Sequence, residues 1–304
     1  MTKLMFGTGS RFARLSRSQA VSIVKTALHH QIYSFDTGFN YGNYRSSPLL
    51  SYALKRSCDD FDSIKISTKL GTYHKCLGTY KDFSVSTLTH SLNSTLSNFY
   101  PFKIDTLYLH GPSIADLQST SLRSFLLKQK ELGNVTRIGV NTHSLEVMTF
   151  LVTHNYPIDV VMIDLNLVQL NRLPLLLQFH ANNIKVVIGT VFCQGLLHQS
   201  PLKLFAYNRS IFVLLRSLLK SSSRRFIIPA HRTRLYLSRN YPDTWHKLPL
   251  SIFTNMPLVE SVSVGMLSPK SIVRNLTSES SIVDDHIISS ILSDLDTPFY
   301  QLSL

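Results

Sequence analysis

Residues 35–42 read Phe-Asp-Thr-Gly-Phe-Asn-Tyr-Gly and follow an apolar run at residues 32–35. The run predicts a short strand, which places Asp36 where a strand ends and a loop begins. Tyr41 comes five residues later, in a loop that contains glycine and asparagine. A carboxylate and a phenol this close together suit a site where a tyrosine exchanges a proton. An ordinary strand followed by a turn has the same pattern, so the segment needs support from the rest of the chain.

Two later predicted strands also end in a titratable residue. Residues 63–69 form a run that ends in Lys69, and residues 104–109 form another that leads into His110. Further strands are predicted at residues 2–6, 134–140, 158–165, 184–188 and 259–264. Amphipathic helices are predicted between the strands, and they begin near Ser16, Pro48, Ser84, Ile114 and Ser144. Ser16 and Gln19 have the spacing of a capping box.

The alternation of strands and helices indicates parallel strands joined by helical crossovers. Eight such units on 304 residues predict an α/β fold, a (β/α)8 TIM barrel in which helices surround an eight-stranded parallel barrel. Chemistry in such barrels takes place at the carboxyl ends of the strands, where Asp36, Lys69 and His110 are expected to lie. Residues 1–304 are assigned to this single domain, with an elaborated loop and helix at about 198–243 and a helical tail at about 277–304.

The composition is that of a folded protein in a reducing compartment. Hydrophobic residues make up 44% of the chain and charged residues 16%, which argues against intrinsic disorder. The three cysteines are odd in number and have no metal-ligand spacing, which favours free thiols. No signal segment is evident, and no apolar run approaches the ~20 residues of a membrane span. We therefore expect a soluble cytoplasmic protein that binds no metal and no membrane.

The net charge of +13 indicates an anionic partner or a generally basic background. Much of the excess lies between Arg216 and Arg239, where Phe226 and Tyr236 also occur. Basic and aromatic residues together are typical of nucleic-acid surfaces, and a phosphate-bearing cofactor would suit the same charge. No recognised nucleic-acid motif accompanies the region, so nucleic acid is not the expected partner.

If the fold brings them together, four residues could act in one proton transfer: Asp36, Tyr41, Lys69 and His110. The pKa of a free tyrosine is about 10, too high for efficient proton exchange at neutral pH. A lysine ammonium beside the phenol would lower that pKa, and Asp36 would hold the lysine in place and keep it charged. His110 could orient a substrate carbonyl or assist the proton transfer. A nicotinamide could supply the hydride, so this chemistry needs no metal.

These residues and their surroundings resemble the aldo-keto reductases. The similar segments are residues 35–42, 66–69, 104–112 and 133–140, and the resemblance covers most of residues 1–200 and returns near 245–276. It implies that the family's catalytic Asp, Tyr, Lys and His fall on Asp36, Tyr41, Lys69 and His110. It also implies an NAD(P)-dependent oxidoreductase that reduces an aldehyde or ketone, or oxidises a sugar or alcohol, with Tyr41 as general acid or base.

The resemblance is weaker around the expected nicotinamide. Asn141 and Thr142 stand where the family usually has Ser-Asn in contact with the carboxamide, and they can still donate and accept hydrogen bonds. Met162 replaces a glutamine that makes another carboxamide contact, although Asn166 is nearby. Gly189 stands where the family has an aromatic residue stacked on the ring.

A later segment, residues 265–271, resembles the family's binding segment for the phosphate of the adenine ribose. It implies cofactor contacts from Gly265, Met266, Lys270 and Ser271, and the helix that starts there can bind phosphate through its backbone donors. Asn275 matches an asparagine that contacts adenine. Ser271 replaces an arginine that often binds the 2′-phosphate, but Lys270 and Arg274 are close by. We therefore expect NADP as the cofactor, with NAD as the alternative.

Two rival functions stay open at this point. A non-catalytic barrel could bind nicotinamide as a sensor or partner subunit, which the departures at Met162 and Gly189 favour. A nucleic-acid-associated protein could use the basic region between Arg216 and Arg239. The expected partner is a small-molecule carbonyl or sugar substrate. The sequence does not identify it, because loops rather than the barrel set specificity in this architecture.

Overall fold

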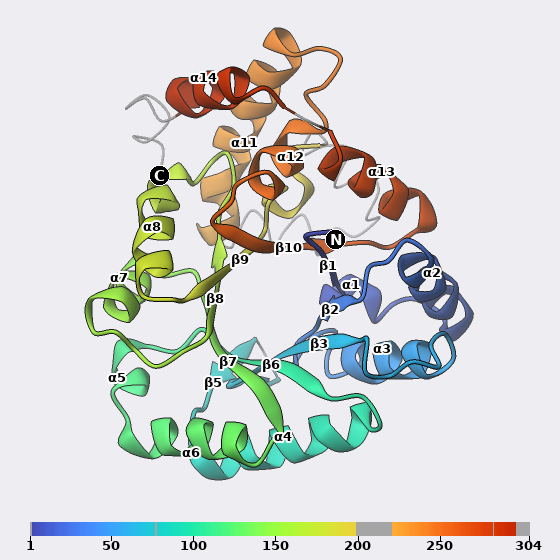
Figure 1. Cartoon of the computed structure of the whole chain (residues 1–304), viewed down its shortest axis with the longest axis vertical. Coiled ribbons are helices and arrows are strands. Elements are labelled where there is room, and N and C mark those ends of the chain that lie inside the picture. The colour runs from blue at the N-terminus through green and yellow to red at the C-terminus, as the bar shows by residue number, and fades with distance from the viewer. Residues whose placement is uncertain (1, 77, 199–220, 282, 296–304) are drawn as a thin grey trace.

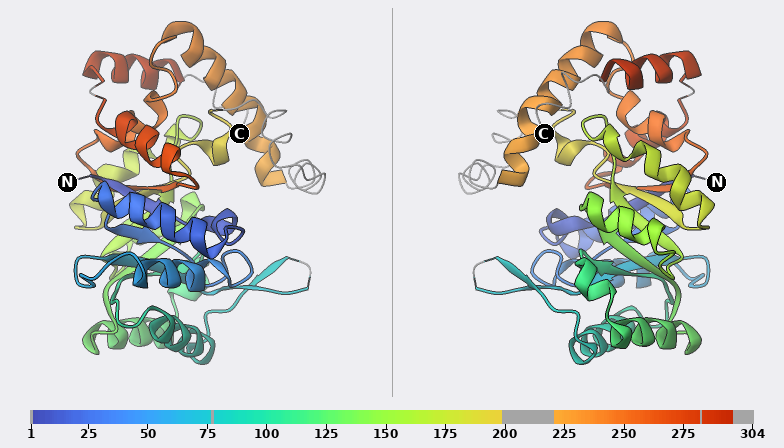
Figure 2. Two further views of the ribbon diagram at one scale, coloured as in Figure 1. Left: turned by 90° about the vertical axis from the view of Figure 1, so that its right-hand side faces the viewer. Right: turned by 90° about the vertical axis from the view of Figure 1, so that its left-hand side faces the viewer.

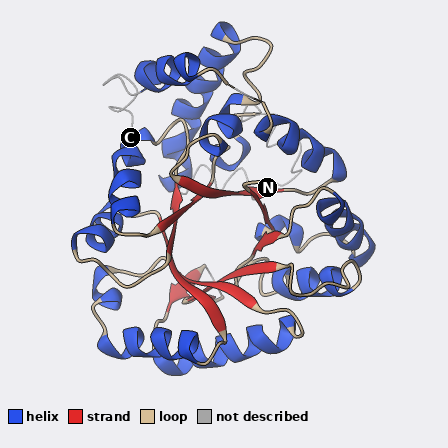
Figure 3. Cartoon of the chain, viewed as in Figure 1, coloured by secondary structure: helices blue, strands red, loops and turns tan. Residues whose placement is uncertain are grey.

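The computed structural model describes residues 2–76, 78–198, 221–281 and 283–295. Eight parallel strands close into a barrel with helices around it (Figures 1 and 3). The barrel strands are β1 Leu4–Gly7, β2 Ser34–Asp36, β3 Lys65–Leu70, β6 Ile104–His110, β7 Val135–Thr142, β8 Val160–Asp164, β9 Lys185–Gly189 and β10 Val259–Gly265. Their order around the barrel is β1-β10-β9-β8-β7-β6-β3-β2, and β2 pairs again with β1. The predicted (β/α)8 fold is confirmed.

The described helices are α1 Gly9–Phe12, α2 Arg17–His29, α3 Ser46–Lys55, α4 Val85–Phe99, α5 Ile114–Leu117, α6 Thr120–Glu131, α7 Leu145–Thr153, α8 Leu173–Ala181, α11 Ser221–Asn240, α12 Leu248–Thr254, α13 Pro269–Glu279 and α14 Asp285–Leu295, with short 3₁₀ turns η1 Leu170–Arg172 and η2 Cys193–Gly195. Five helices, α2, α3, α4, α5 and α7, begin within two residues of the starts that the sequence predicts. Ser16 and Gln19 form the predicted capping box. The helix expected from Ile114 is two helices, because Ser119 caps α6 by accepting a hydrogen bond from the backbone of Leu122.

The barrel strands bury side chains on both of their faces. One small cluster consists of Met5, Tyr108, Val160, Met162 and Val187, which come from strands on several sides of the barrel. Alternate residues of the same strands join a much larger cluster with the helices. This is the period-two pattern of a strand, with one set of side chains filling the barrel and the other packing beneath the helices.

Two β-bulges meet at the end of the barrel where the strands begin. The pairing of β3 with β6 skips Asp105, and the pairing of β9 with β10 skips Glu260. Arg137 on β7 bonds to both bulged carboxylates, with Nη2 2.9 Å from Asp105 and Nη1 2.7 Å from Glu260. Since a bulge redirects a side chain, the two extra residues bring both acids to one arginine and tie β6, β7 and β10 together.

One element that the sequence reasoning did not predict is an antiparallel hairpin after β3. It consists of β4 Thr72–His74 and β5 Thr79–Lys81. Figure 2 shows the hairpin extending from the same side of the barrel as α11. This is the side of the carboxyl ends of the strands, because the hairpin continues directly from the end of β3.

The predicted elaboration at residues 198–243 is described only in part. Helix α11 accounts for residues 221–240, and the segment 199–220, including Arg216 and Lys220, lies outside the described residues. Ala230 of α11 packs against Val168 and Cys193. The predicted helical tail contains α14, which bonds to α11 through Tyr236 and Asp294. Among the described helices, none has the length and hydrophobicity to cross a bilayer.

Candidate active site

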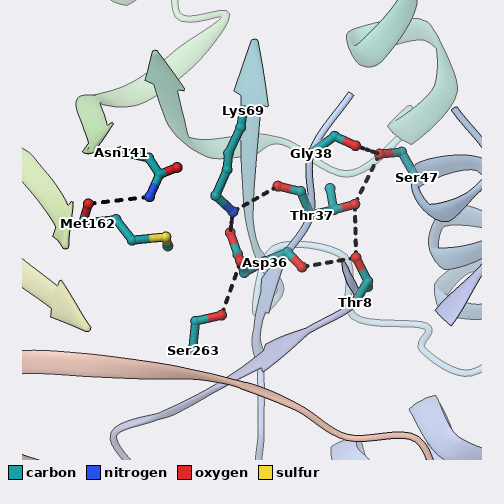
Figure 4. A network of polar contacts seen from close by, with 9 residues as sticks. All are labelled: Thr8, Asp36, Thr37, Gly38, Ser47, Lys69, Asn141, Met162 and Ser263. Carbon is teal, nitrogen blue, oxygen red and sulfur yellow. Dashed lines mark hydrogen bonds and ion pairs between the residues drawn. The ribbon is translucent and has the colours of Figure 1, made fainter. Parts of the chain in front are cut away.

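A buried ion pair between Asp36 and Lys69 lies at the carboxyl end of the barrel. The two residues come from the neighbouring strands β2 and β3 and are only 4% and 2% exposed. Lys69 Nζ donates a hydrogen bond to Asp36 Oδ1 and another to the backbone oxygen of Thr37, at 3.2 Å (Figure 4). Burial alone would lower the pKa of Lys69, but the Asp36 carboxylate and Tyr41 raise it above its ordinary value. Lys69 is therefore a charged ammonium at neutral pH.

Ser263, on the last barrel strand β10, contacts the second oxygen of the Asp36 carboxylate. Its Oγ donates to Asp36 Oδ2 at 3.0 Å. Ser263 is not among the site residues predicted from the sequence. Strand alternation could have found it, because Val262 and Val264 are buried in the larger core and Ser263 must then point to the opposite face.

Tyr41 lies beside the lysine. Lys69 Nζ is 5.1 Å from the centroid of the Tyr41 ring. Gly38 lets the ring approach the backbone, because a Cβ at that position would stand 2.9 Å from two carbons of the Tyr41 ring. The loop after β2 therefore folds back so that the phenol meets the end of the neighbouring strand.

The expected lowering of the Tyr41 pKa does not hold for the protein as described. Burial raises the pKa of Tyr41 above its ordinary value, and the positive charge of Lys69 opposes this rise without cancelling it. The charge of Lys69 is evident from the sequence, whereas the burial of Tyr41 is not. Lys69 stabilises the phenolate, as expected, and the protonated phenol is nonetheless the resting form at neutral pH.

His110 ends β6 and faces the same point. Its ring centroid is 5.9 Å from that of Tyr41, with the two planes at 81°. Burial, followed by the positive charges of Lys69, His143 and Lys81, lowers the pKa of His110 to about 3. Its Nδ1 is buried and has no hydrogen-bond partner among the described residues. His110 is therefore neutral at physiological pH.

The predicted cofactor residues on β7 and just after β8 are buried at the same end of the barrel. Asn141 is 6% exposed, and its Nδ2 donates to the backbone oxygen of Met162 at 3.3 Å. The Thr142 hydroxyl accepts from the backbone of Ser144 at 3.1 Å. Asn166 Oδ1 accepts from the backbone of Val168 at 3.0 Å, so this side chain already shapes its own loop.

The second group of predicted cofactor residues surrounds the start of α13. Gly265 and Lys270 are exposed, whereas the Met266 side chain is fully buried in the core. Ser271 forms a capping box with Ser268, so its hydroxyl is turned toward the helix end. Met266 as a whole is 0% exposed, so neither its side chain nor its backbone is accessible to a cofactor in this structure.

Asn275 is the predicted cofactor residue whose chemistry best fits a ligand. It is 1% exposed, and neither its Oδ1 nor its Nδ2 has a partner among the described residues. Leaving two polar atoms buried and unbonded costs free energy, so such a group calls for an explanation. A ligand that presents both a donor and an acceptor, as an adenine edge does, would satisfy it.

The positions at Met162 and Gly189 fit a nicotinamide less well. Met162 is buried among apolar side chains and offers no hydrogen bond to a carboxamide. A Cβ at Gly189 would meet nothing closer than 3.7 Å, so a side chain could start there, but glycine supplies none to stack on a ring. The residues present therefore fit the adenine end of a dinucleotide better than its nicotinamide ring.

Taken together, the fold brings all four predicted catalytic residues to one end of the barrel. A phenol lies against a buried ammonium, a carboxylate holds that ammonium, and a neutral imidazole stands opposite. This arrangement defines a class of barrel protein that can move a proton to or from a substrate oxygen.

Comparison with known proteins agrees with that class. Residues 3–211 match the model of the Aldo/keto reductase family, and the chain therefore belongs to this family of oxidoreductases. The match spans more than half of the 304 residues. Enzymes of this family typically depend on NAD(P)H.

Two solved structures share the fold at low sequence identity. Aldo-keto reductase AKR11C1 from Bacillus halodurans, in its holo form, has a TM-score of 0.76 and 17% identity, covering 97% of this chain and 92% of that one. The glycerol dehydrogenase AKR11B4 from Gluconobacter oxydans has a TM-score of 0.69 and 16% identity, covering 96% and 90%. At these identities the likeness concerns the fold.

One characterised relative is similar in sequence over part of its length. L-galactose dehydrogenase from Arabidopsis thaliana is 26% identical over 158 residues, which are 51% of this chain and 48% of the relative. The match thus spans about half of each protein.

Proposed function

We propose that this chain is an NAD(P)-dependent oxidoreductase that interconverts a small aldehyde or ketone and the corresponding alcohol, with Tyr41 as general acid or base. The observation that carries the proposal is the contact of the Tyr41 phenol with a buried, charged Lys69 held by Asp36. Burying an ammonium is costly unless an opposite charge and hydrogen bonds compensate it. Asp36 and the backbone oxygen of Thr37 compensate Lys69, which keeps a positive charge beside the Tyr41 phenol.

Each residue has a distinct role in this reaction. A nicotinamide bound here would supply the hydride for reduction of the carbonyl carbon or accept it in oxidation of the alcohol. In reduction the Tyr41 hydroxyl gives its proton to the substrate oxygen, and Lys69 stabilises the phenolate that results. Asp36 keeps Lys69 charged and in place. His110 is neutral, so it can donate a hydrogen bond to the substrate oxygen without competing for the proton.

The cofactor would be held mainly by its adenosine end. Asn275 would bind adenine, and Lys270 and Arg274 are exposed on α13 where a 2′-phosphate could meet them. Asn141 remains the best-placed side chain for the carboxamide. The net charge of +13 supports NADP over NAD, because NADP carries the additional phosphate.

The relatives support a small hydroxylated substrate. One is described as an L-galactose dehydrogenase and another as a glycerol dehydrogenase, so both names refer to polyhydroxylated molecules. Sugars, polyols and short aldehydes are accordingly the first compounds to assay.

Fluorescence titration with NADPH and NADH tests the binding half of the proposal. Trp245 packs partly buried against the core and is the only tryptophan of the chain, so quenching and energy transfer to the reduced nicotinamide report on binding. Saturable binding, tighter for NADPH, is expected. Absence of binding for both would remove the basis of the proposed function.

Tyr41→Phe tests the catalytic half. The variant keeps the ring and loses the proton, so turnover should fall by about 100- to 10,000-fold while the affinity for NADPH changes by less than about twofold. Initial rates with an aldehyde panel and the same fluorescence titration measure the two quantities. Turnover that survives the substitution would exclude Tyr41 as the acid.

A non-catalytic nicotinamide-binding barrel is the second candidate. The apolar side chain of Met162 and the lack of a side chain at Gly189 favour it, because both weaken the hold on the reacting ring. It predicts NADPH binding without turnover of any aldehyde, ketone, sugar or polyol in either direction. Measurable turnover that depends on Tyr41 decides for the enzyme.

A further inference from the structure

His143 and Asp164 form an ion pair near the proposed catalytic residues. His143 directly follows β7, and Asp164 is the last residue of the adjacent strand β8. His143 Nδ1 is 2.5 Å from Asp164 Oδ2. The aspartate side chain is only 15% exposed and the histidine side chain 63%, so a largely buried carboxylate holds an exposed imidazole.

His143 is fixed from its backbone as well. Arg172, itself only 8% exposed, donates from Nη2 to the backbone oxygen of His143 at 3.0 Å. Ordering an exposed side chain costs conformational entropy, which an ordinary surface histidine avoids. A side chain held in place before a ligand arrives loses less entropy on binding, and this is the usual arrangement of a recognition group.

The pair faces the region where the substrate would lie. Val160 and Met162 of β8 belong to the cluster inside the barrel, so strand alternation turns Asp164 toward the same interior. Asn141, two residues before His143, stands beside His110 in the pairing of β6 with β7. The charge of His143 also contributes to the lowered pKa of His110, and that of Asp164 to the raised pKa of Tyr41, as their proximity requires.

The chemistry of the pair selects one kind of ligand. Since Nδ1 is turned to Asp164, Nε2 is the atom left to meet a substrate. No hydrogen bond of Nε2 exists within the described part of the chain. Asp164 raises the pKa of His143. Nε2 donates a hydrogen bond when the imidazole is protonated and accepts one when it is neutral, so it can bond to a hydroxyl group in either state. The ionised pair has no net charge, which favours a neutral hydroxyl group over a carboxylate or phosphate.

We propose that the His143–Asp164 pair determines substrate specificity through a hydrogen bond between His143 Nε2 and a substrate hydroxyl group next to the reacting carbonyl. The proposal rests on the proposed oxidoreductase function and narrows its substrates to hydroxyaldehydes, hydroxyketones and the polyols formed from them. Asp164 acts through His143 and is a positioning residue.

Glyceraldehyde and propanal form a matched pair of substrates for the test. They share a three-carbon aldehyde skeleton and differ by two hydroxyl groups. The quantity to measure is the preference, defined as kcat/KM for glyceraldehyde divided by kcat/KM for propanal, with NADPH saturating. The wild type should prefer glyceraldehyde. In His143→Phe the preference should fall about tenfold, corresponding to one lost hydrogen bond, and the change should appear in the KM for glyceraldehyde.

Three further variants separate recognition from structure. His143→Gln keeps a side-chain donor and should retain at least half of the wild-type preference. Asp164→Asn leaves the imidazole without its anion and should lower the preference less than His143→Phe does. His90→Phe replaces an exposed histidine on the outer helix α4 and should leave the preference unchanged. Because His143 is exposed, unchanged thermal unfolding is expected for its variants.

The possible results separate the role of His143 in specificity from the proposed oxidoreductase function. An equal loss of both substrates in His143→Phe, or an unchanged preference, overturns the inference and leaves the oxidoreductase function standing. A wild-type protein that binds NADPH but reduces neither aldehyde and oxidises no polyol overturns both. A selective loss in His143→Phe that His143→Gln restores supports the inference.

Discussion

Lys69 is a charged side chain almost completely enclosed by protein, and its environment explains why it stays charged. Asp36 neutralises it directly, and Ser263 satisfies the second oxygen of that carboxylate. A buried pair of this kind contributes little to stability relative to an apolar pair, but breaking it leaves one charge uncompensated. The residue is thus a structural requirement of the site as well as a proposed catalytic one.

Lys69→Met should therefore affect folding and chemistry together. We expect the free energy of unfolding to fall by about 3–5 kcal/mol, since Asp36 remains buried without its counterion. Turnover should fall by about 100-fold or more, because nothing then stabilises the Tyr41 phenolate. Urea unfolding and initial rates measure the two effects.

Ser263→Ala is the matched control for this substitution. It removes one hydrogen bond from the same carboxylate and leaves the ion pair intact, so a loss of about 1 kcal/mol is expected. If Lys69→Met were as stable as Ser263→Ala, the loss of Lys69 would not leave a costly uncompensated charge on Asp36.

The pH dependence of the reaction follows from two shifted residues. The pKa of Tyr41 is raised, so the protonated acid needed for reduction persists to higher pH. His110, with a pKa of about 3, stays neutral throughout the neutral range. Titration of these two residues should therefore leave kcat/KM for propanal reduction level between about pH 5 and 9, while alcohol oxidation, which needs the phenolate, should rise across it. A loss of reduction centred near pH 7 that disappears in a His110 variant would contradict the assigned pKa.

The four proposed catalytic residues could be predicted because each belongs to a local pattern. Asp36, Lys69 and His110 end apolar runs, and Tyr41 lies in the loop after one of them. The sign of the Tyr41 pKa shift could not be predicted, because burial depends on strands distant in sequence. The bonds of Ser263 to Asp36 and of Asp164 to His143 likewise depend on which strands become neighbours.

At the scale of elements, the paired bulges at Asp105 and Glu260 have the largest structural consequence. Both add a residue to a strand, and both extra residues are acids that bind Arg137. One side chain on β7 thereby connects its neighbour β6 with β10, which lies three places away around the barrel. The two bulges thus supply the carboxylates through which Arg137 links the three strands.

Arg137→Met should weaken the barrel without disturbing the site at its other end. All three side chains are less than one-third exposed, so the loss should be about 2–3 kcal/mol in the free energy of unfolding. NADPH affinity should stay within about twofold of wild type. Denaturant unfolding and fluorescence titration provide these values.

Lys103→Met provides the comparison for an exposed ion pair. Lys103 and Asp62 are each at least 80% exposed, and pairs of this kind contribute little in water. Its unfolding midpoint should match the wild type. Equal effects of the two substitutions would mean that Arg137 acts as an ordinary surface charge.

The barrel strands were predictable as elements, and the hairpin after β3 was not. Each barrel strand is a short run rich in apolar and β-branched residues that the fold buries. The two hairpin strands have only three residues each, and all three residues of β5 are exposed, so the sequence pattern is too short to predict a strand there. The break between α5 and α6 was not predicted. Ser113 caps the start of α5, and Ser119, which caps α6, lies inside a stretch that the sequence pattern predicts as one helix.

For the molecule as a whole, the charge of +13 should act on any anionic ligand. A positive field raises the local concentration of anions, and salt screens it. The affinity for NADPH should therefore decline more steeply than that for NADH between about 50 and 300 mM salt, because only NADPH carries the 2′-phosphate. Parallel titrations measure the slopes. Equal slopes would indicate that the basic residues do not meet the 2′-phosphate.

Closure of the barrel also joins the first strand to the last. β1 pairs with β10 from Leu4 and Val262 to Gly7 and Gly265, and Glu279 accepts hydrogen bonds from Thr2 and Lys3. Synthesis on the ribosome proceeds from the amino end, so one edge of β1 stays unpaired until nearly the whole chain has been made. Such distant pairings slow folding, and open strand edges pair with other chains. The interval between the emergence of β1 and that of β10 is therefore when a nascent molecule most needs a chaperone.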